Sequence, residues 1–540
     1  MQTNWKPRLV VAALVSGAAV YGCFNFEDAR SRCEQDGRCT QPDGGVVCNP
    51  SSEEDVPDDD FQDTNCDGVD GMADGGIFVD PANGKEGALG TATDPVKRLG
   101  EALDRIRQGT APRQVYLSQG NYNESGLVLD TQVSLYGAYG GRDNWQRQGD
   151  FVTHLDGGPV GLAINGIPED AGMVLDRLSV SSANVPDSGM PSIALQVIDS
   201  QGVRLRYDTF TAGQGGPGTD GTSGARGTDG GSGADGGNAV QATAGSFGAR
   251  GLSNCGGTNA AGGNGQDGVA GGYLPGAPGE MGQPPGLGGT GGTGGEAGAP
   301  IDGGGGFISC RAGDGGVGDP GKPGEAGSAG PGGTGMGELN GSQWVATQQG
   351  GPGDAGTVGG GGGGGGSGGA CKREGVVAGA AGAGSGGGGS GGCSGGGGKG
   401  GGGGGASISV LLIRSNVTFE GNAMLRTRGG GRGGMGGEGG PGGAGGLGGP
   451  GGMADVISSG TYNSYGGNGG AGGTGGQGGP GGPGGGGGGG PSVGIWCSPD
   501  AGFVNAGTLD NQPANGGPGG TSAGGNAGQP GQQAPYQGCP

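Results

Sequence analysis

Glycine returns at every third position over long stretches of this chain. The three-residue spacing is kept from Gly215 to Gly236. The same spacing begins again in six later runs: 286–298, 315–333, 350–368, 386–404, 430–451 and 466–490. A three-residue period with glycine at the repeated position selects an extended backbone with three residues per turn, in which one position per turn has no room for a Cβ atom. The period therefore predicts left-handed extended helices of the polyproline II type.

Collagen has the same period, but it needs unbroken triplets and proline at about 15–20% of residues or more. Here each run is short, and only 32 of 540 residues are proline. The triplets more closely resemble those of the snow flea antifreeze protein and of the glycine-rich tips of some phage adhesins, in which one chain folds several such helices side by side. That resemblance implies a polyglycine II bundle. The alternative is a disordered spacer, because glycine-rich sequence buries little apolar surface.

Short strand-like segments recur about every 20 residues between the signal region and the first glycine run, a spacing typical of solenoid coils. They lie at 77–80, 115–117, 133–136, 154–155, 173–180, 193–198 and 203–210. Asp94 and Pro95 predict an N-cap and a first helical residue. A helix from there to about Arg107 would place four apolar residues on one face: Val96, Leu99, Leu103 and Ile106.

The stretch 77–139 resembles the opening of right-handed parallel β-helix proteins of the pectate lyase-like group, through VDP at 79–81, a Gly/Thr turn, DP at 94–95, the amphipathic helix and VYL at 115–117. The resemblance implies a stack of coils whose open end is covered by the helix. Further coil-like pieces at 406–428 and 491–512 indicate that the glycine runs leave the stack and return to it; the alternative is that these pieces are turns within the bundle. The predicted class is all-β, a right-handed parallel β-helix interrupted and followed by a glycine-rich polyglycine II-type bundle.

The expected organisation has six parts. They are a signal peptide at 1–22, a cysteine-rich acidic tether at 23–75, a β-helix with an N-terminal capping helix at 76–212, glycine triplets at 213–405, a glycine-rich hairpin at 429–490 and a glycine-rich C-terminal tail at 513–540.

The N-terminus has the layout of a secretory signal, with Lys6 and Arg8 followed by an uncharged apolar run to residue 20. VYGC at 20–23 resembles the lipobox of bacterial lipoproteins, which implies a diacylglyceryl group on Cys23. Tyr21 departs from that pattern, so that a plain signal peptide is the alternative. Phe24 is not the acidic residue associated with retention in the inner membrane, and the resemblance therefore implies a lipid anchor in the outer membrane.

Eleven cysteines are present, and ten remain if Cys23 is lipidated. The chain has no CxxC motif and His154 is its single histidine, which leaves almost no ligand set for structural zinc. We expect disulfides formed in an oxidising compartment. The spacing leaves their connectivity open.

Residues 63–74 match the calcium-loop pattern D-x-[DN]-x-[DN]-G-x5 with an acid at the last place. Asp63, Asn65, Asp67 and Asp74 would supply oxygen ligands to Ca²⁺, and Gly68 would form the sharp turn. The loop resembles those of thrombospondin type-3 repeats and EF-hands, although Asp74 replaces the usual Glu and no flanking helices are evident. A solvated acidic linker is the alternative.

Catalysis on a β-helix would require clustered carboxylates and basic residues. The candidates are Asp156, Asp176, Asp199 and Asp208 with Arg177, Arg204 and Arg206, but each stands alone in the sequence. GxSxG occurs around Ser367 and Ser390 without a strand-to-helix context, and Lys399 is followed by glycine where a P-loop needs Ser or Thr. We therefore expect no enzyme.

The net charge of −22 argues against nucleic acid and anionic lipid surfaces as partners. The favoured function is a cell-surface structural or adhesive lipoprotein that binds polysaccharide or a partner protein. The alternatives are a polysaccharide lyase or hydrolase on the same scaffold and, for the glycine region, a flexible spacer.

Overall fold

The computed structural model describes residues 48, 50–52, 54–142, 144–303, 307–372, 378–459 and 462–540. The chain divides into two compact units, 1–72 and 73–540. Within the described part of the second unit the regular structure is nearly all β, with one α-helix, α2 (Leu99–Arg107), and a short 3₁₀ turn, η1 (Glu169–Ala171). The predicted all-β class with parallel sheets is confirmed.

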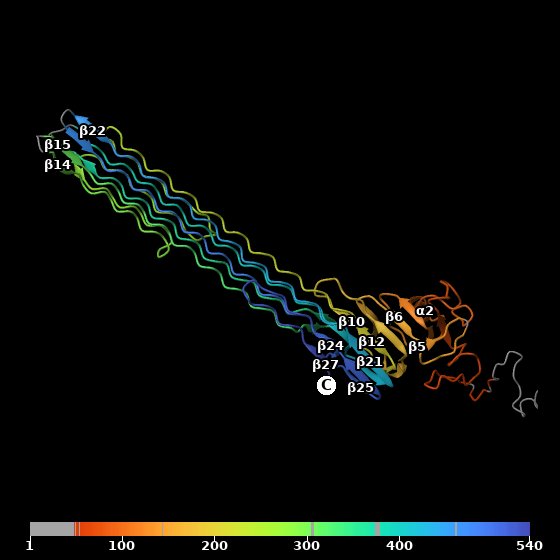
Figure 1. The fold of residues 1–540 in the computed structure, drawn as a ribbon. Coiled ribbons are helices and arrows are strands. Elements are labelled where there is room, and N and C mark those ends of the chain that lie inside the picture. The colour runs from red at the N-terminus through yellow and green to blue at the C-terminus, as the bar shows by residue number, and fades with distance from the viewer. Residues whose placement is uncertain are drawn as a thin grey trace, which may run out of the picture. The chain divides into compact units, whose positions relative to one another are not determined.

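Three parallel sheets form what we call the coil stack (Figure 1). The first sheet contains, in order, β1 (Gly76–Val79), β2 (Gln114–Ser118), β5 (Ser134–Tyr139), β8 (Val174–Asp176), β11 (Val203–Arg206), β20 (Asn416–Glu420) and β25 (Gly502–Asn505). The second contains β3 (Gly120–Asn123), β6 (Thr153–Asp156), β9 (Leu178–Ser181), β12 (Thr209–Ala212), β21 (Asn422–Thr427) and β26 (Thr508–Gln512). The third contains β4 (Val128–Leu129), β7 (Val160–Asn165), β10 (Ser192–Ile198), β19 (Ser407–Ile413), β24 (Ser492–Cys497) and β27 (Gln533–Gln537).

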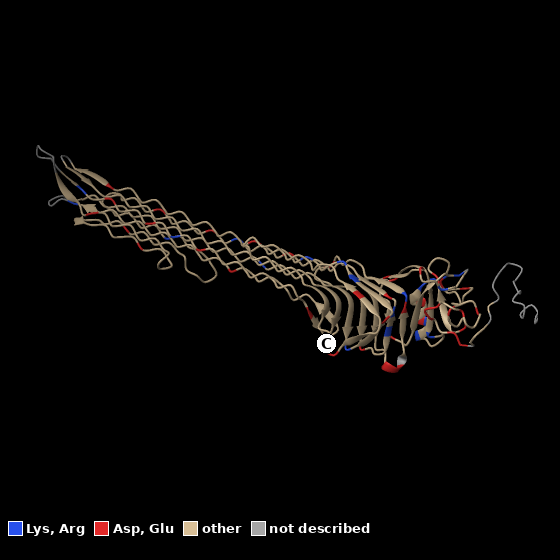
Figure 2. Ribbon diagram, turned by 60° about the horizontal axis from the view of Figure 1, so that its bottom comes forward, with Lys and Arg blue, Asp and Glu red and all other residues tan. Residues whose placement is uncertain are grey.

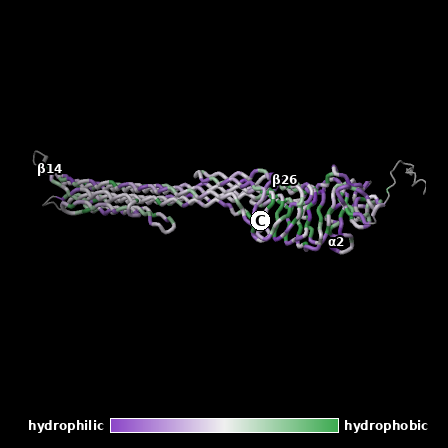
Figure 3. Tube along the Cα trace, turned by 90° about the horizontal axis from the view of Figure 1, so that it is seen from below, coloured by the Kyte–Doolittle hydropathy of each residue, from purple (hydrophilic) through white to green (hydrophobic). Residues whose placement is uncertain are grey.

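The chain visits the three sheets in rotation, so that each turn adds one strand to every sheet. Alternate side chains point into the stack and align from coil to coil: on the first sheet Leu135 pairs in register with Leu175, Leu205 follows, and Phe419 comes next. All four are fully buried. Full burial of such a side chain contributes about 1.5–3 kcal/mol, and Figure 3 shows the hydrophobic residues concentrated in this part of the chain.

The helix begins later than expected, at Leu99 with Arg98 as its N-cap, and the prediction from Asp94 and Pro95 was wrong. The preceding residues are held extended, because Val96 donates its N–H to the carbonyl of Phe78 at 3.0 Å. The first helical N–H groups are satisfied instead from the next coil, where the Glu124 carboxylate accepts from Leu99 at 2.7 Å and from Gly100 at 2.9 Å.

All glycine insertions leave the stack at the same corner, after a strand of the second sheet and before a strand of the third. They connect β12 to β19, β21 to β24, and β26 to β27. We call residues 213–405, 429–490 and 513–532 the glycine bundle. The expected C-terminal tail thus ends in a strand, β27, which pairs with β24 and is tied to it through the Cys497–Cys539 disulfide.

Segments of the glycine bundle run out and back beside one another and hydrogen-bond through their backbones. A three-membered pattern is formed by Gly218 N–H to Arg432 O (2.7 Å), Gly434 N–H to Gly402 O (2.9 Å) and Gly402 N–H to Thr219 O (2.7 Å). The pattern repeats every three residues along the three segments 215–237, 384–405 and 429–452. Three further long segments, 313–333, 348–369 and 466–490, are bonded in the same way.

The close approach of these backbones explains why glycine is required at every third position. A Cβ atom built on Gly221 would lie 2.1 Å from the carbonyl oxygen of Lys399, far inside van der Waals contact. Charged residues, which are dense on the coil stack, are sparser along the bundle (Figure 2).

Short strands close the turns at both ends of the bundle. The end remote from the stack carries β13 (Tyr273–Leu274) with β18 (Ala370–Cys371), and a four-stranded sheet of β14 (Ala299–Gly303), β15 (Phe307–Arg311), β23 (Tyr462–Tyr465) and β22 (Val456–Ser459) (Figure 1). At the end near the stack, the hairpin of β16 (Glu338–Asn340) and β17 (Gln343–Val345) packs Trp344 against Trp496, on the outer side of the third sheet.

Candidate functional site

The outer face of the second sheet presents two columns of polar side chains, which we call the polar ladder. One column runs through Asn121, His154, Ser179, Thr209, Met424 and Asp510, and the other through Asn123, Asp156, Ser181, Thr211, Arg426 and Gln512. The sequence places them there because alternate residues of a strand face opposite sides of its sheet. Their inward neighbours, such as Leu155, Val180 and Phe210, are fully buried.

The other two outer faces differ in character. That of the third sheet is apolar, and Trp344 of the β16–β17 hairpin packs on Ile408, Leu411 and Trp496. On the first sheet, Arg147 of the segment 144–152 lies over the rings of Tyr136 and Tyr139, and Trp145 of the same segment contacts Phe78 and Tyr139. The polar ladder is therefore the outer face best suited to binding a hydroxyl-rich or amide-rich partner.

His154 sits at the centre of a hydrogen-bonded group on this face. Its Nδ1 lies 3.0 Å from Ser179 Oγ and its Nε2 lies 3.2 Å from Ser181 Oγ. Ser181 Oγ also donates to Asp156 Oδ1 at 3.0 Å. A catalytic triad requires the carboxylate to orient the second ring nitrogen of histidine, but here both nitrogens face serines. The hydrogen bonds hold the side chains of His154, Ser181 and Asp156 in fixed positions, and their order differs from that of a catalytic triad.

Arg426 and Asp510 form an ion pair further along the ladder. The pKa of Asp510 is lowered because the Arg426 guanidinium hydrogen-bonds its carboxylate. Around this pair the ladder offers hydroxyl, amide and imidazole groups, which both donate and accept hydrogen bonds.

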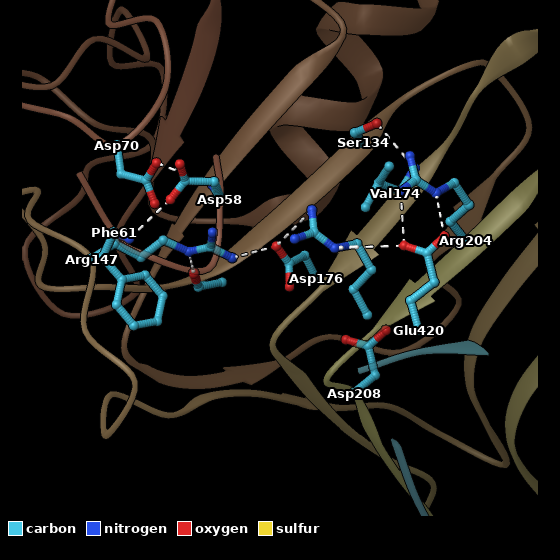
Figure 4. A network of polar contacts seen from close by, with 12 residues as sticks. Asp58, Phe61, Asp70, Ser134, Arg147, Val174, Asp176, Arg204, Asp208 and Glu420 are labelled. Atoms are coloured by element: carbon cyan, nitrogen blue, oxygen red, sulfur yellow. Dashed lines mark hydrogen bonds and ion pairs between the residues drawn. The ribbon is translucent and has the colours of Figure 1, made fainter. Parts of the chain in front are cut away.

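The strongest charge cluster lies on the first sheet (Figure 4), and it includes three residues considered as catalytic candidates. The carboxylate of Asp176 is fully buried and lies 2.8 Å from the Arg147 guanidinium and 3.6 Å from that of Arg206. Glu420 accepts two hydrogen bonds from Arg204, at 2.7 and 2.8 Å. A carboxylate enclosed in this way between arginines is unavailable to a substrate, and we interpret the cluster as structural.

Asp208 lies at the corner between the first and second sheets and is also fully buried. Burial raises the pKa of its carboxyl well above the ordinary value, although Leu178 N–H donates to Oδ1 at 2.8 Å. Asp199 lies at a different corner, where Arg414 binds it through two hydrogen bonds of 2.6 and 2.8 Å and lowers its pKa. Arg177 stacks over the ring of Tyr207 at 4.2 Å. Asp208 thus lies near Asp176 and Arg206, whose charges act on its pKa (Figure 4), whereas Asp199 is paired with Arg414 at another corner.

The serines of the two GxSxG matches are buried in the glycine bundle. Ser367 Oγ accepts a hydrogen bond from Ala277 N–H at 2.9 Å, and Ser390 Oγ accepts one from Gly231 N–H at 2.8 Å. Each serine joins two neighbouring segments. Lys399 is exposed on the bundle, and its backbone N–H donates to Thr222 O.

The predicted calcium loop begins in the first unit, where its side chains hydrogen-bond to its own backbone. Asp63 accepts from Gly68 N–H at 2.8 Å, and Asn65 Nδ2 donates to Asp67 Oδ2 at 2.9 Å. Asp74 is exposed and belongs to the second unit. Among the described residues no three His, Cys, Asp or Glu side chains are grouped as metal ligands, and calcium binding stays a prediction. Cys23 and the signal region 1–22 lie outside the described residues.

Disulfides were expected, and the described residues contain four: Cys48–Cys66, Cys255–Cys393, Cys310–Cys371 and Cys497–Cys539. Sequence reasoning missed several other residues. Arg147 and Trp344 lie in segments whose sequence has no strand pattern. Their structural roles follow from contacts with Asp176 and Trp496, which lie elsewhere in the chain. An alternation of outward polar residues in 153–156 and 178–181 was the available signal for the polar ladder.

Comparison with protein-family models, with curated proteins and with solved structures found no match to this chain. In the part of the chain that the structure describes, none of the helices has the length and apolarity needed to cross a bilayer.

Proposed function

We propose that this protein is a cell-surface structural and adhesive module that binds polysaccharide or a partner protein and performs no catalysis. Its coil stack is a right-handed parallel β-helix of the pectate lyase-like kind, and its glycine bundle is of the polyglycine II type. Cys23 carries the lipid anchor that holds it in the outer membrane, and the loop from Asp63 to Asp74 binds Ca²⁺ within the tether.

The observation that carries this proposal is the backbone hydrogen bonding of the glycine bundle. Each long segment donates and accepts at every third residue, with N···O distances close to 2.8 Å, for example Gly224 N–H to Glu438 O and Gly446 N–H to Ser390 O. A flexible spacer leaves such groups to water. A bonded bundle of this kind supports the proposal of a stiff scaffold that holds its end sheet away from the stack.

The polar ladder supports recognition of an extended polymer. Neighbouring strands are about 4.8 Å apart, so that a chain lying along the stack meets a new pair of side chains at each strand. That repeat is close to the length of one sugar residue in an extended polysaccharide. The shallow row of serine, threonine, asparagine and imidazole groups suits sugar hydroxyls, whereas nucleic acid would require a basic surface.

The test uses the purified full chain attached to beads through its N-terminal end. We would measure retention of the beads on surfaces coated with cellulose, xylan, dextran or alginate, and on outer-membrane protein extract. The variant Thr209→Arg/Thr211→Arg places two long cations in the middle of the polar ladder. The control, Thr418→Arg, adds the same side chain to the outer face of the first sheet, where Thr418 is half-buried.

Retention of the wild type that falls about tenfold in the ladder variant and stays unchanged in the control is the expected result. Absence of retention on every surface would contradict the proposal. Release of unsaturated or reducing sugar ends from any of these polysaccharides would favour the alternative, an enzyme built on the same scaffold.

A further inference from the structure

A cavity of about 420 Å³ opens where the glycine bundle meets the coil stack. Its walls come from four places: the start of β7, strand β10 with the loop before it, the β16–β17 hairpin, and two bundle segments. Cavities of this size accommodate small ligands. None of its residues belongs to the polar ladder or to the charge cluster of Figure 4.

The lining of the cavity is neutral throughout. Val160, Met190, Ile193 and Trp344 supply apolar surface, and no Asp, Glu, Lys, Arg or His lines it. In a chain with a net charge of −22, a wall without a single ionisable side chain favours an uncharged ligand, because burying a charge without a partner is costly.

Polar groups without protein partners are distributed around this apolar surface. The side chains of Ser188, Thr219, Gln343 and Gln349 line the cavity and make no hydrogen bond to any described residue. Gln196 is partly fixed, since its Nε2 donates to Ser342 O at 3.1 Å. Glutamine amides and hydroxyls in this arrangement suit a ligand with several hydroxyl groups.

Trp344 forms part of the apolar wall. Its side chain is 3% exposed and packs against Trp496, with ring centroids 6.4 Å apart. The indole is thereby held beside the cavity, where it supplies apolar surface.

We propose that this cavity binds a neutral sugar unit, one or two residues of a glycan without carboxylate, sulfate or phosphate groups. The hydroxyls of a sugar would hydrogen-bond to the amides of Gln196, Gln343 and Gln349, and its C–H faces would pack on Val160, Ile193 and Trp344. This goes beyond the proposed function, because the cavity shares no residue with the polar ladder. Failure of one therefore leaves the other standing.

The test is isothermal titration of the full chain with maltose, cellobiose and N,N′-diacetylchitobiose, with digalacturonic acid as the charged comparison, while tryptophan fluorescence is recorded. Gln196→Ala is the first variant. Its matched control is Gln201→Ala, since Gln201 is equally half-buried and also donates one amide hydrogen bond to a backbone carbonyl, Arg414 O at 3.2 Å, away from the cavity.

Saturable binding of at least one neutral disaccharide is expected, with the acid binding at least tenfold more weakly. Gln196→Ala should weaken binding about three- to tenfold, as the loss of one hydrogen bond does, and Gln201→Ala should not change it. Trp344→Phe should weaken binding and abolish the fluorescence response while the melting transition persists. Equal binding of acid and neutral sugars, equal effects of the two glutamine variants, or no binding of any neutral disaccharide would overturn the proposal.

Discussion

The Arg147 guanidinium and the Asp176 carboxylate meet at 2.8 Å with neither side chain exposed to solvent. Arg147 also donates Nε to the carbonyl of Gly137 at 2.9 Å and lies over the rings of Tyr136 and Tyr139. The Arg147 side chain thus neutralises the buried Asp176 carboxylate and holds the segment 144–152 against the first sheet.

Arg147→Met should destabilise the protein by about 3–5 kcal/mol, because it leaves a buried carboxylate without its closest cation. Arg414→Met is the control, since the Arg414–Asp199 pair is about half exposed and solvent-exposed ion pairs contribute little to stability. Chemical denaturation of both variants would measure the difference. Equal losses would contradict a structural role for the Arg147–Asp176 pair.

Asp208 predicts a pH dependence of stability. Burial raises its pKa above that of the unfolded chain, so that the folded state loses stability as pH rises from the unfolded value of about 4 towards the folded pKa. Asp208→Asn should therefore raise the melting temperature near neutral pH, with an advantage that disappears below about pH 4. Melting curves across this range would show it.

The Asp199→Asn variant should behave in the opposite sense, because Arg414 lowers the pKa of Asp199. A small loss of stability at neutral pH that fades in acid is expected there. If Asp208→Asn lost stability at neutral pH, the assignment of a raised pKa to the buried Asp208 carboxyl would be wrong.

Neighbouring glycines of one bundle segment differ sharply in the space around them. A Cβ atom on Gly395 would lie 1.9 Å from Gly440 O, whereas on Gly396 the nearest atom, Ala225 N, would be 3.2 Å away. The packing of a bundle segment therefore depends on glycine at the positions that face a neighbouring backbone, and not on its overall glycine content.

Gly395→Ala should lower stability by about 1–3 kcal/mol or more, the usual cost of forcing atoms into a packed interior, and Gly396→Ala by much less. Thermal unfolding followed by circular dichroism would compare the two. Equal tolerance of alanine at both positions would show that these segments do not pack as described.

The sequence alone was sufficient to predict most of the repeating strands. It was insufficient to predict the contacts between segments that are far apart in the chain. Period and alternation predicted strands such as β2, β10 and β19, but β7 was missed because Val160 and Gly161 follow a glycine–proline turn that obscured its pattern. Residues 94–96 resemble a helix start in isolation, and only the pairing of Val96 with Phe78 keeps them extended.

The candidate site was only partly predictable for a related reason. Outward polar residues of the ladder follow from strand alternation once the strands are known. The β16–β17 hairpin, which covers part of the third sheet with Trp344, and the cavity beside it arise from contacts between segments that are far apart in sequence. No local sequence pattern predicts these contacts.

Across the second unit, the three parallel sheets of the coil stack bring each coil into contact with the coils before and after it. The final strand of the stack, β27, pairs with β24 and is tied to it by the Cys497–Cys539 disulfide. In proteins built from stacked coils, stability is approximately a sum of nearest-neighbour terms. A mutation that destabilises the last coil should therefore leave the stability of distant coils unchanged.

The Cys497→Ala/Cys539→Ala variant should speed amide hydrogen exchange in β24 and β27, and leave β7 and β10 unchanged. The matched variant Cys255→Ala/Cys393→Ala removes a bond within the glycine bundle and should leave β27 unaffected. Uniform acceleration across all three sheets would instead indicate a single cooperative unit.

The partners of the first glycine run are made late in synthesis. Met435 donates its N–H to Asp220 across 215 residues of chain, and Ala444 does the same to Asp229. A nascent chain that has produced only the first excursion has no second or third excursion to pair with it. Since contacts between distant residues slow folding, the bundle should assemble last, after the C-terminal part has emerged. A ribosome-stalled product that ends before residue 384 lacks both long partner segments of the run 215–237, which are 384–405 and 429–452. In such a product the early glycine triplets should be open to protease.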